Sequence, residues 1–419
     1  MKKLIFILTA IFTLTISNEL ANGQGGWVQK GSFSGTARGD AFYFSIGNKG
    51  YIGGGEDISG TYVNDFWEYD AISNYWTQKA SFPGGTRCQA VSFNIGSKGY
   101  VGTGSGSGGL YNDFWEYDPS TDTWTQKANL PAEARTAGIG FSIGNKGYLG
   151  TGYGCSPVPC TETNHNDFWE YDPAADTWSQ KANIPTNGRG YAFGLSIGSK
   201  GYVGTGHDDY GNIFNDFWEY NPLTDVWTQK TNYPSGQRND IDGAHFTIGN
   251  YGYVGTGCSA SVLQLYNDFW RYDPTSDIWT QIPNLPAQAR IGSINFSINN
   301  KGYIGLGFWV TSVVHYLDDL WSFSDTTSQV GINEVINNNS ISFSPNPFSI
   351  QTTLWSDHIL KNATIIVYNS YGQAIKQIIN ISGYTITLHC EDLANGMYFI
   401  RLIQDNKISL TDKVVITDN

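Results

Sequence analysis

Short runs in which hydrophobic and polar residues alternate recur along the chain, separated by glycine- and aspartate-rich breaks. One unit contains an alternating run such as residues 41–46, a glycine–tyrosine run such as residues 98–104 and an aromatic run such as residues 112–118. A Trp-x-Gln-Lys run follows the aromatic run after a short turn, as at residues 124–127. Alternation with a period of two predicts strands, and the breaks predict turns. Each unit is therefore predicted to hold four short strands.

The unit recurs with a period of about fifty residues, which is typical of solenoids and propellers. Its Asn-Asp-Phe-Trp run, or a shorter version of it, begins at Asn64, Asn112, Asn166, Asn215, Asn267 and Asp318. The last unit stops at Phe323 without a Trp-x-Gln run, whereas an extra one, Trp27-Val-Gln-Lys, stands before the first unit. An N-terminal strand that completes the last unit explains this offset. We therefore expect a closed ring of six units, which leaves no end unit in need of a cap.

These repeated runs resemble the kelch motif. The likeness lies in the glycines after the second strand, the x-Trp-x-Tyr-Asp third strand and a tryptophan six residues later, and it covers about residues 26–325. The glycine doublet is present only at residues 53–55 and is replaced elsewhere by Gly-Thr-Gly or Gly-Leu-Gly. The resemblance implies an all-β, six-bladed kelch-type β-propeller, closed by the N-terminal strand, over residues 24–325.

A different composition follows the repeats. Residues 326–341 are polar and are predicted to form a linker, and residues 342–419 contain strand-like runs that predict a small C-terminal β-sandwich. The order Pro-Asn-Pro, Val-Tyr-Asn-x-x-Gly, Leu-x-x-Gly-x-Tyr-x-x-Arg-Leu and Lys-Val-Val-Ile resembles the type A C-terminal sorting domain of the Bacteroidota type IX secretion system. The resemblance implies that type IX machinery is a partner, that the tail is removed, and that the protein is then attached to the cell surface or released.

The N-terminus predicts a secretory signal peptide over residues 1–23. Two lysines precede an apolar run from Leu4 to Ile16, and Ala21 and Gly23 supply small residues before an expected cleavage at Gln24. The apolar run is too short to span a bilayer, and we expect no transmembrane segment in the mature chain. The net charge of −13 makes nucleic acid an unfavourable partner.

The cysteines indicate neither a metal site nor a disulfide scaffold. Cys155 and Cys160 lie in one loop and are a candidate disulfide, whereas the remaining three cysteines show no metal-ligand spacing. We therefore expect no metal and no cofactor.

Differences among the units point to one rim of the ring as the ligand-binding face. The loop between the second and third strands varies in length, whereas the other two turns of the unit do not. Strand parity places these variable loops beside the segments that carry a recurring arginine, at positions 38, 87, 135, 189, 238 and 290. Because every unit has it, we expect this arginine to pair with the aspartate of Asp-Phe-Trp, as Arg38 with Asp65. A ring that binds anions is the alternative.

Residues on this rim that depart from the repeat are the candidate ligand-binding residues. They are Glu56, Asp57, Tyr153, His165, His207, Asp208, Asp209, Tyr210, Asp240, Asp242, Trp309, His315 and Tyr316. Trp309 lies outside the repeat, and it either stacks on a sugar face or packs over the rim. The adjacent His207, Asp208 and Asp209 offer cation ligands, although three neighbouring polar residues in a loop are usually solvated.

Catalytic signatures are weak. The glycine-rich run at residues 102–108 leads into a strand, so it lacks the helix dipole of a phosphate-binding loop. No Cys, His and Tyr set matches the copper-radical oxidases of the galactose oxidase type. We expect an exported protein that uses one rim to recognise a glycan or a protein. The alternative is a carbohydrate-active enzyme of the kelch type, such as a sialic acid mutarotase-like isomerase, since the fold does not decide function.

Overall fold

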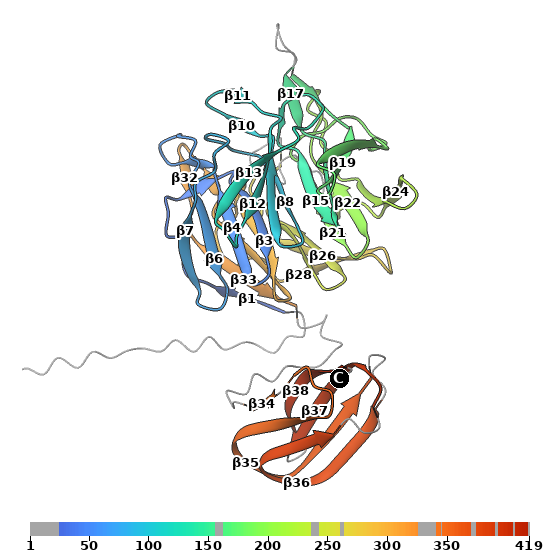
Figure 1. Ribbon diagram of the computed structural model, residues 1–419. Helices are drawn as coiled ribbons and strands as arrows, with labels where there is room; N and C mark the ends of the chain where they lie inside the picture. Colours follow the sequence, from blue (N-terminus) through green and yellow to red (C-terminus); the bar gives the residue numbers. More distant parts are fainter. Residues whose placement is uncertain are drawn as a thin grey trace, which may run out of the picture. The chain divides into compact units, whose positions relative to one another are not determined.

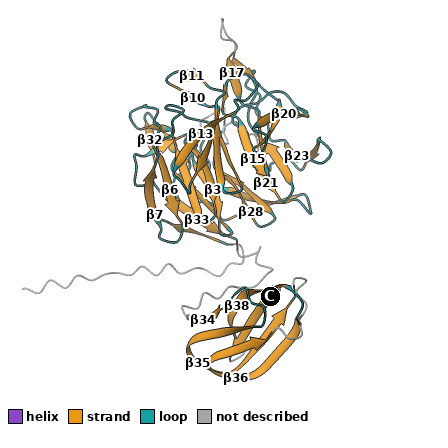
Figure 2. Cartoon of the chain, viewed as in Figure 1, coloured by secondary structure: helices purple, strands orange, loops and turns teal. Residues whose placement is uncertain are grey.

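The computed structural model describes residues 25–155, 162–235, 243–259, 264–325, 341–344, 346–369, 374–389, 393–404 and 407–417. Throughout these residues the regular elements are β-strands (Figure 2), so the all-β prediction is confirmed. The chain divides into two compact units, Met1–Ser328 and Gln329–Asn419. The predicted signal peptide lies outside the described residues, as does the predicted linker up to residue 340.

The described residues of the first unit form six four-stranded antiparallel sheets, which we call blades 1 to 6 (Figure 1). Blade 1 consists of β3 (Phe42–Ile46), β4 (Lys49–Gly53), β6 (Phe66–Asp70) and β7 (Tyr75–Lys79). Blade 2 consists of β8 (Val91–Ile95), β9 (Lys98–Gly102), β12 (Phe114–Asp118) and β13 (Thr123–Lys127). Blade 3 consists of β15 (Ile139–Ile143), β16 (Lys146–Gly150), β19 (Phe168–Asp172) and β20 (Thr177–Lys181).

The remaining blades repeat this plan. Blade 4 consists of β21 (Phe193–Ile197), β22 (Lys200–Gly204), β23 (Phe217–Asn221) and β24 (Val226–Lys230). Blade 5 consists of β25 (His245–Ile248), β26 (Tyr251–Gly255), β27 (Phe269–Asp273) and β28 (Ile278–Ile282). Blade 6 consists of β29 (Ile294–Ile298), β30 (Lys301–Gly305), β33 (Leu320–Ser324) and the N-terminal strand β1 (Gly26–Gln29). Contacts between first strands run from β3 through β8, β15, β21, β25 and β29 back to β3, so the blades surround one axis.

The N-terminal strand closes this ring, as the sequence predicts. Strand β1 pairs antiparallel with β33, which places Trp27 opposite Phe323. The indole of Trp27 is half-buried, packs against the ring of Phe269 at 4.8 Å between centroids, and donates a hydrogen bond to the Pro283 carbonyl at 2.8 Å. The tryptophan in the fourth strand of blade 2, Trp124, bonds in the same way to a carbonyl of the preceding blade. Trp27 therefore joins blade 6 to the preceding blade by the same hydrogen bond that the repeat tryptophan makes in blade 2.

In five of the blades, a buried arginine, an aspartate and a tryptophan form a hydrogen-bonded group at one end. In blade 1, Arg38 Nη2 donates to Asp65 Oδ2 at 2.9 Å, and the indole of Trp67 donates to the same oxygen at 2.7 Å. The same ion pair joins Arg87 to Asp113, Arg135 to Asp167, Arg189 to Asp216 and Arg290 to Asp319. The predicted pairing is confirmed in these five blades. The alternative prediction, that these arginines form a ring that binds anions, is wrong. The sixth arginine, Arg238, lies outside the described residues.

Glycine in the second strand allows neighbouring blades to approach each other. A Cβ atom at Gly99 in β9 would lie 2.2 Å from the ring of Phe44 in β3, and one at Gly147 would lie 2.2 Å from Phe93. The phenylalanine of one blade therefore packs directly on the backbone of the next. This contact explains why the glycine recurs at a position that is otherwise unfavourable for it in a strand.

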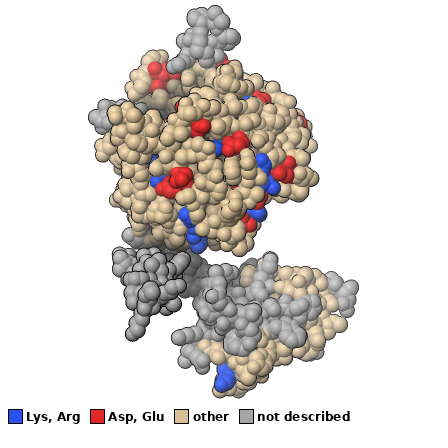
Figure 3. All heavy atoms as spheres, turned by 90° about the vertical axis from the view of Figure 1, so that its left-hand side faces the viewer, with Lys and Arg blue, Asp and Glu red and all other residues tan. Residues whose placement is uncertain are grey.

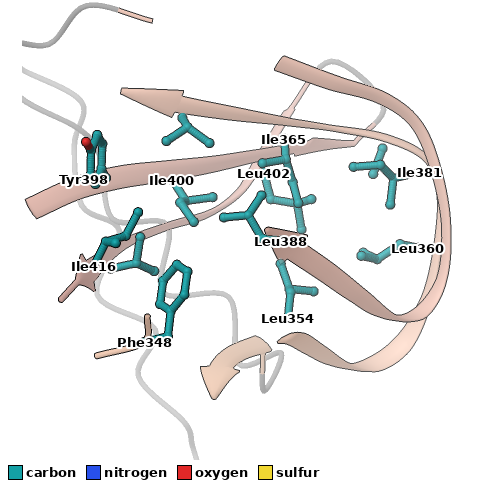
Figure 4. Close-up of a cluster of buried hydrophobic side chains, with 13 residues drawn as sticks. Phe348, Leu354, Leu360, Ile365, Ile381, Leu388, Tyr398, Ile400, Leu402 and Ile416 are labelled. Atoms are coloured by element: carbon teal, nitrogen blue, oxygen red, sulfur yellow. The ribbon is translucent and has the colours of Figure 1, made fainter. Parts of the chain in front are cut away.

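The second unit is one continuous sheet with the strand order β34-β35-β37-β38, in which β36 pairs with the other edge of β35. Its strands are β34 (Ile341–Ser344), β35 (Gln351–Tyr368), β36 (Ala374–His389), β37 (Gly396–Gln404) and β38 (Lys407–Ile416). The pairing of β35 with β36 shifts register between Trp355 and Ala363. The long strands curve there around a buried cluster that includes Leu354, Ile365 and Leu402 (Figure 4). The sheet therefore folds over its own core, which agrees with the small β-sandwich that the sequence predicts.

Candidate ligand-binding rim

The variable loops and the arginine-bearing segments lie at the same end of the first unit. Strand β2 (Arg38–Gly39) pairs with β5 (Glu56–Asp57), and β14 (Arg135–Thr136) pairs with β17 (Tyr153–Cys155), which pairs with β18 (Glu162–Asn164). Two hairpins, β10 (Ser105–Gly106) with β11 (Gly109–Leu110) and β31 (Phe308–Val310) with β32 (Val314–Tyr316), are the corresponding loops of blades 2 and 6 (Figure 1). We call the surface formed by these loops the variable rim. Its location agrees with the one that strand parity predicts.

Two candidate carboxylates hold their own loops closed. Asp57 Oδ1 accepts hydrogen bonds from the backbone N–H groups of Ser59 at 2.9 Å and Thr61 at 3.2 Å. The hydrogen bond from the Ser59 hydroxyl is the main reason why the pKa of Asp57 is lowered. In blade 4, Asp208 Oδ1 accepts from the N–H groups of Tyr210 at 3.0 Å and Asn212 at 2.9 Å. Both carboxylates therefore accept hydrogen bonds from backbone N–H groups of their own turns, and the two turns are of the same kind.

Asp208 is also buried, which distinguishes it from its neighbour. Burial opposes ionisation, but hydrogen bonds from Asn212 and Asn187 outweigh it, so the pKa of Asp208 is lowered. Asp209 is exposed, and its Oδ1 accepts from the backbone N–H and the side-chain amide of Asn164 in blade 3, at 2.8 and 2.7 Å. The two adjacent aspartates thus point to different partners and do not converge on one point. In the part of the chain that the structure describes, no cluster of His, Cys, Asp and Glu has a composition suited to a metal ion.

The candidate histidines and tyrosine of blades 3 and 4 take part in local packing. His165 Nε2 lies 3.3 Å from Glu133 Oε2, and burial together with the charge of Arg135 lowers the pKa of this histidine. Tyr153 is half-buried, and in backbone register it pairs with Thr136 in β14. His207 stacks on Tyr191 at 5.3 Å between ring centroids and 14° between planes. These three candidate side chains therefore pack against other residues of the rim.

Tyr210 and the hairpin of blade 6 present the exposed part of the rim. Tyr210 is 87% exposed. Trp309 stacks on His315 with centroids 4.0 Å apart and planes inclined by 12°, so one face of the indole is covered. Tyr316 packs against Phe308 at 5.4 Å. Burial, followed by the charge of Glu56 in blade 1, raises the pKa of Tyr316. Gly307 N donates to Arg38 O at 2.9 Å, so the loops of blades 6 and 1 are neighbours.

Three candidate residues are outside the described part of the chain: Asp240, Asp242 and Cys160. Cys155 ends strand β17, but the placement of its side chain is not described, so the candidate disulfide with Cys160 stays a prediction.

The sequence did not predict a set of residues that lie around the axis of the ring. Two positions after the recurring arginine, the residues with positive φ are Asp40, Gln89, Ala137, Tyr191 and Gly292. Their backbones form hydrogen bonds from blade to blade around the axis, for example from Gln89 N to Asp40 O at 2.9 Å and from Tyr191 N to Ala137 O at 3.0 Å. A signal for them exists in the sequence, because this position differs from unit to unit beside an arginine that does not.

Beneath these residues, a cavity of about 70 Å³ lies on the axis. All six blades contribute to its lining, and its hydrogen-bonding side chains include Asp40, Tyr43, Gln89, Ser92, His245 and Ser293. Its volume is far below the roughly 300–1,000 Å³ of pockets that enclose whole small molecules. A complete sugar therefore does not fit inside it.

Charged side chains on the outer wall are sparse. On the face that Figure 3 shows, acidic and basic residues lie singly or in mixed pairs among uncharged ones. Ion pairs among the described residues include Lys49 with Asp70 and Lys98 with Asp118. This wall is not a continuous surface of one charge.

Two parts of the chain match known protein families. Residues 28–190 match the family model of the KLHDC2/KLHL20/DRC7 Kelch-repeats domain, and residues 252–286 match that of the Kelch motif. Residues 342–417 match the Secretion system C-terminal sorting domain. No curated protein sequence matches the chain. Among the described residues, no helix has the length and apolar character required to cross a membrane.

Proposed function

This chain is a kelch-repeat propeller with a C-terminal sorting domain of the type IX secretion system, and from this premise we propose that it is exported and binds a protein partner through the variable rim. Kelch repeats favour protein binding, and the sorting domain indicates secretion or attachment to the cell surface. The proposal that residues 1–23 and 342–419 are removed during export follows from the same sorting domain and from the N-terminal sequence.

The observation that carries the proposal is the exposed apolar surface of the variable rim. Ile58 in the loop of blade 1 is 69% exposed, and Val313 in the hairpin of blade 6 is 57% exposed. Gly307 N donates to Arg38 O at 2.9 Å, and Arg38 pairs in register with Asp57, so the loops that carry these aliphatic side chains are neighbours on the rim. Binding residues often lie on loops that a rigid scaffold positions, and contiguous exposed apolar patches mark surfaces that bind proteins.

A glycan is the less favoured ligand for this rim. Sugar recognition uses open aromatic faces, but His315 covers one face of Trp309. Tyr210 is the exposed aromatic residue of blade 4, whereas the most exposed hydrophobic side chains in the loops of blades 1 and 6 are the aliphatic Ile58 and Val313. The small axial cavity also favours binding of a macromolecule over the rim rather than turnover of a sugar within it.

Site-specific photo-crosslinking of the full chain in an exporting cell tests this function. A photoreactive phenylalanine analogue replaces Ile58 or Val313 on the rim, and in the matched control it replaces Ile72, which is 78% exposed in the turn between β6 and β7. We expect a discrete protein adduct from the two rim positions and none from the control. An adduct from Ile72 alone, glycan-array binding that the rim substitutions abolish, or conversion of a free sugar by the purified protein would contradict the proposal.

A further inference from the structure

The axial cavity exists because the six blades differ where their first strands face the axis. At the second residue of the aligned strand, the blades carry Tyr43, Ser92, Gly140, Gly194, His245 and Asn295. The rings of Tyr43 and His245 lie 6.2 Å apart, and Asn295 fixes the tyrosine by a hydrogen bond to its hydroxyl at 2.8 Å. Glycines in blades 3 and 4 put no side chain opposite these rings. The uneven set leaves the cavity of about 70 Å³.

The mouth of the cavity carries a polar side chain held by long hydrogen bonds. Gln89 Nε2 lies 3.4 Å from Asp40 Oδ2, and Gln89 Oε1 lies 3.3 Å from the Thr136 hydroxyl and 3.5 Å from the Tyr191 hydroxyl. Strong bonds of this kind measure about 2.7–3.0 Å. The Gln89 amide can therefore exchange these partners for a better-placed group at little cost.

The cavity wall also contains a buried hydroxyl without a partner. Ser293 is 5% exposed and lines the cavity, and its Oγ finds no hydrogen-bond partner among the described residues. An unpaired buried hydroxyl destabilises a fold, and such groups are rare in native proteins. Its position on the cavity wall indicates a partner that enters from the mouth.

The occupant is expected to be uncharged. Burial lowers the pKa of His245 to about 4, so its imidazole is neutral at neutral pH. Among the described residues, the other ionisable groups that line the cavity are Asp40 and Tyr43. The same burial that removes the charge from His245 opposes the entry of a charged ligand.

We propose that the axial cavity is a binding site for a carboxamide group. Its volume of about 70 Å³ admits a small polar group but is far below that of pockets that enclose whole small molecules. A carboxamide is of this size, is uncharged, and presents both a donor and an acceptor. Its NH₂ donates to Asp40 or to the Gln89 oxygen, and its oxygen accepts from the Ser293 hydroxyl. That the group belongs to an Asn or Gln side chain of a protein partner rests on the proposed function; the site itself does not.

Acetamide is the probe that tests this site in the intact protein. NMR signals of the His245 ring are followed during titration with acetamide, acetate and methylammonium, and under xenon pressure as the apolar comparison. Ser293→Ala removes the hydroxyl from the cavity, and Ser322→Ala removes a hydroxyl from a residue that is equally buried in β33 and absent from the lining. We expect saturable shifts with acetamide only, weakened at least tenfold in S293A and unchanged in S322A.

The melting temperature separates binding from a structural role. Since the Ser293 hydroxyl is unpaired, S293A should melt at the same temperature as the parent protein or above it. A lower melting temperature for S293A, tighter binding of methylammonium or xenon, or acetamide binding that S293A leaves unchanged would overturn the proposal. Acetamide binding without any rim adduct would leave this site standing and refute the proposed protein partner.

Discussion

Replacing Trp27 by alanine tests whether the N-terminal strand closes the ring. The indole packs on Phe246, Phe269 and Phe323, and its N–H donates to Pro283 O at 2.8 Å. At fully buried sites, replacing tryptophan by alanine lowers the free energy of unfolding by about 3–5 kcal/mol. Trp27 is half-buried and also loses one hydrogen bond, so we expect a loss of about 3 kcal/mol in the free energy of unfolding.

Two variants calibrate this expectation. Trp124 occupies the corresponding place in blade 2 and donates to Ala80 O at 3.0 Å, so W124A should cost nearly as much as W27A. Val28 lies in the same strand as Trp27 and is exposed, so V28A should leave stability almost unchanged.

Urea denaturation followed by tryptophan fluorescence and calorimetry measures these differences. For a domain of this size about 3 kcal/mol corresponds to a fall in melting temperature of roughly 6 °C. Deletion of residues 24–32 should lower it further, because it also exposes the edge of β33. If W27A and V28A melted within a degree of each other, the strand would add nothing to the ring and the closure argument would be refuted.

Four further changes have expected outcomes. Asp113→Ala leaves the buried Arg87 without its carboxylate and should cost about 3–5 kcal/mol in urea unfolding, whereas the exposed Asp209→Ala should cost under about 1. Burial lowers the pKa of His245 from 6.5 to about 4, so its contribution to the free energy of unfolding is complete above pH 6.5 and is lost as the pH falls to 4. H245N should therefore remove up to about 3 kcal/mol of the loss in stability between these two pH values, measured by urea unfolding. Trp309→Ala should weaken partner binding by about 1–3 kcal/mol in a titration without lowering the melting temperature, and a loss of folding would refute its assignment to the rim. Deletion of residues 342–419 should leave a folded propeller that stays inside the cell envelope, and its appearance in the medium would contradict the sorting role.

The repeat was readable from the sequence because its spacing follows from contacts within one blade. Aspartate and tryptophan stand two residues apart in Asp-Phe-Trp because the indole of Trp67 and the guanidinium of Arg38 bind the same carboxylate. The N-terminal strand was predictable for a similar reason, since only a strand with Trp-x-Gln can fill the empty edge of β33.

The candidate site was harder to predict, because the residues that form it depend on how the loops fold and how the blades pack together. Asp208 looks like a ligand in sequence, yet its carboxylate accepts hydrogen bonds from its own turn. Trp309 looks like an open platform, yet the hairpin register puts His315 against its face. Ser293 and Gln89 carry no local signal, since their place at the cavity depends on the ring that brings six distant strands together.

The bend of the sorting domain was also beyond the sequence. Its alternating runs predict strands, but they do not reveal that β35 changes partners along its length, from β34 near Leu354 to β37 near Val367. Register irregularities between Trp355 and Ile365 lie where β35 changes partner.

The axis is the place where this fold can vary without losing its closure. The blade-to-blade bonds around the mouth, such as Asp40 N to Gly292 O at 2.9 Å and Ala137 N to Gln89 O at 3.2 Å, use backbone atoms alone. Any residue that tolerates positive φ can therefore stand there, at a conformational cost of roughly 1–2 kcal/mol for a residue other than glycine. Four of the five described positions nevertheless carry a side chain, and three of these are polar or aromatic. The side chains add only long hydrogen bonds between blades, such as Gln89 Nε2 to Asp40 Oδ2 at 3.4 Å, so their main use has to be sought in the cavity that Asp40 and Gln89 line and in a ligand that approaches the rim.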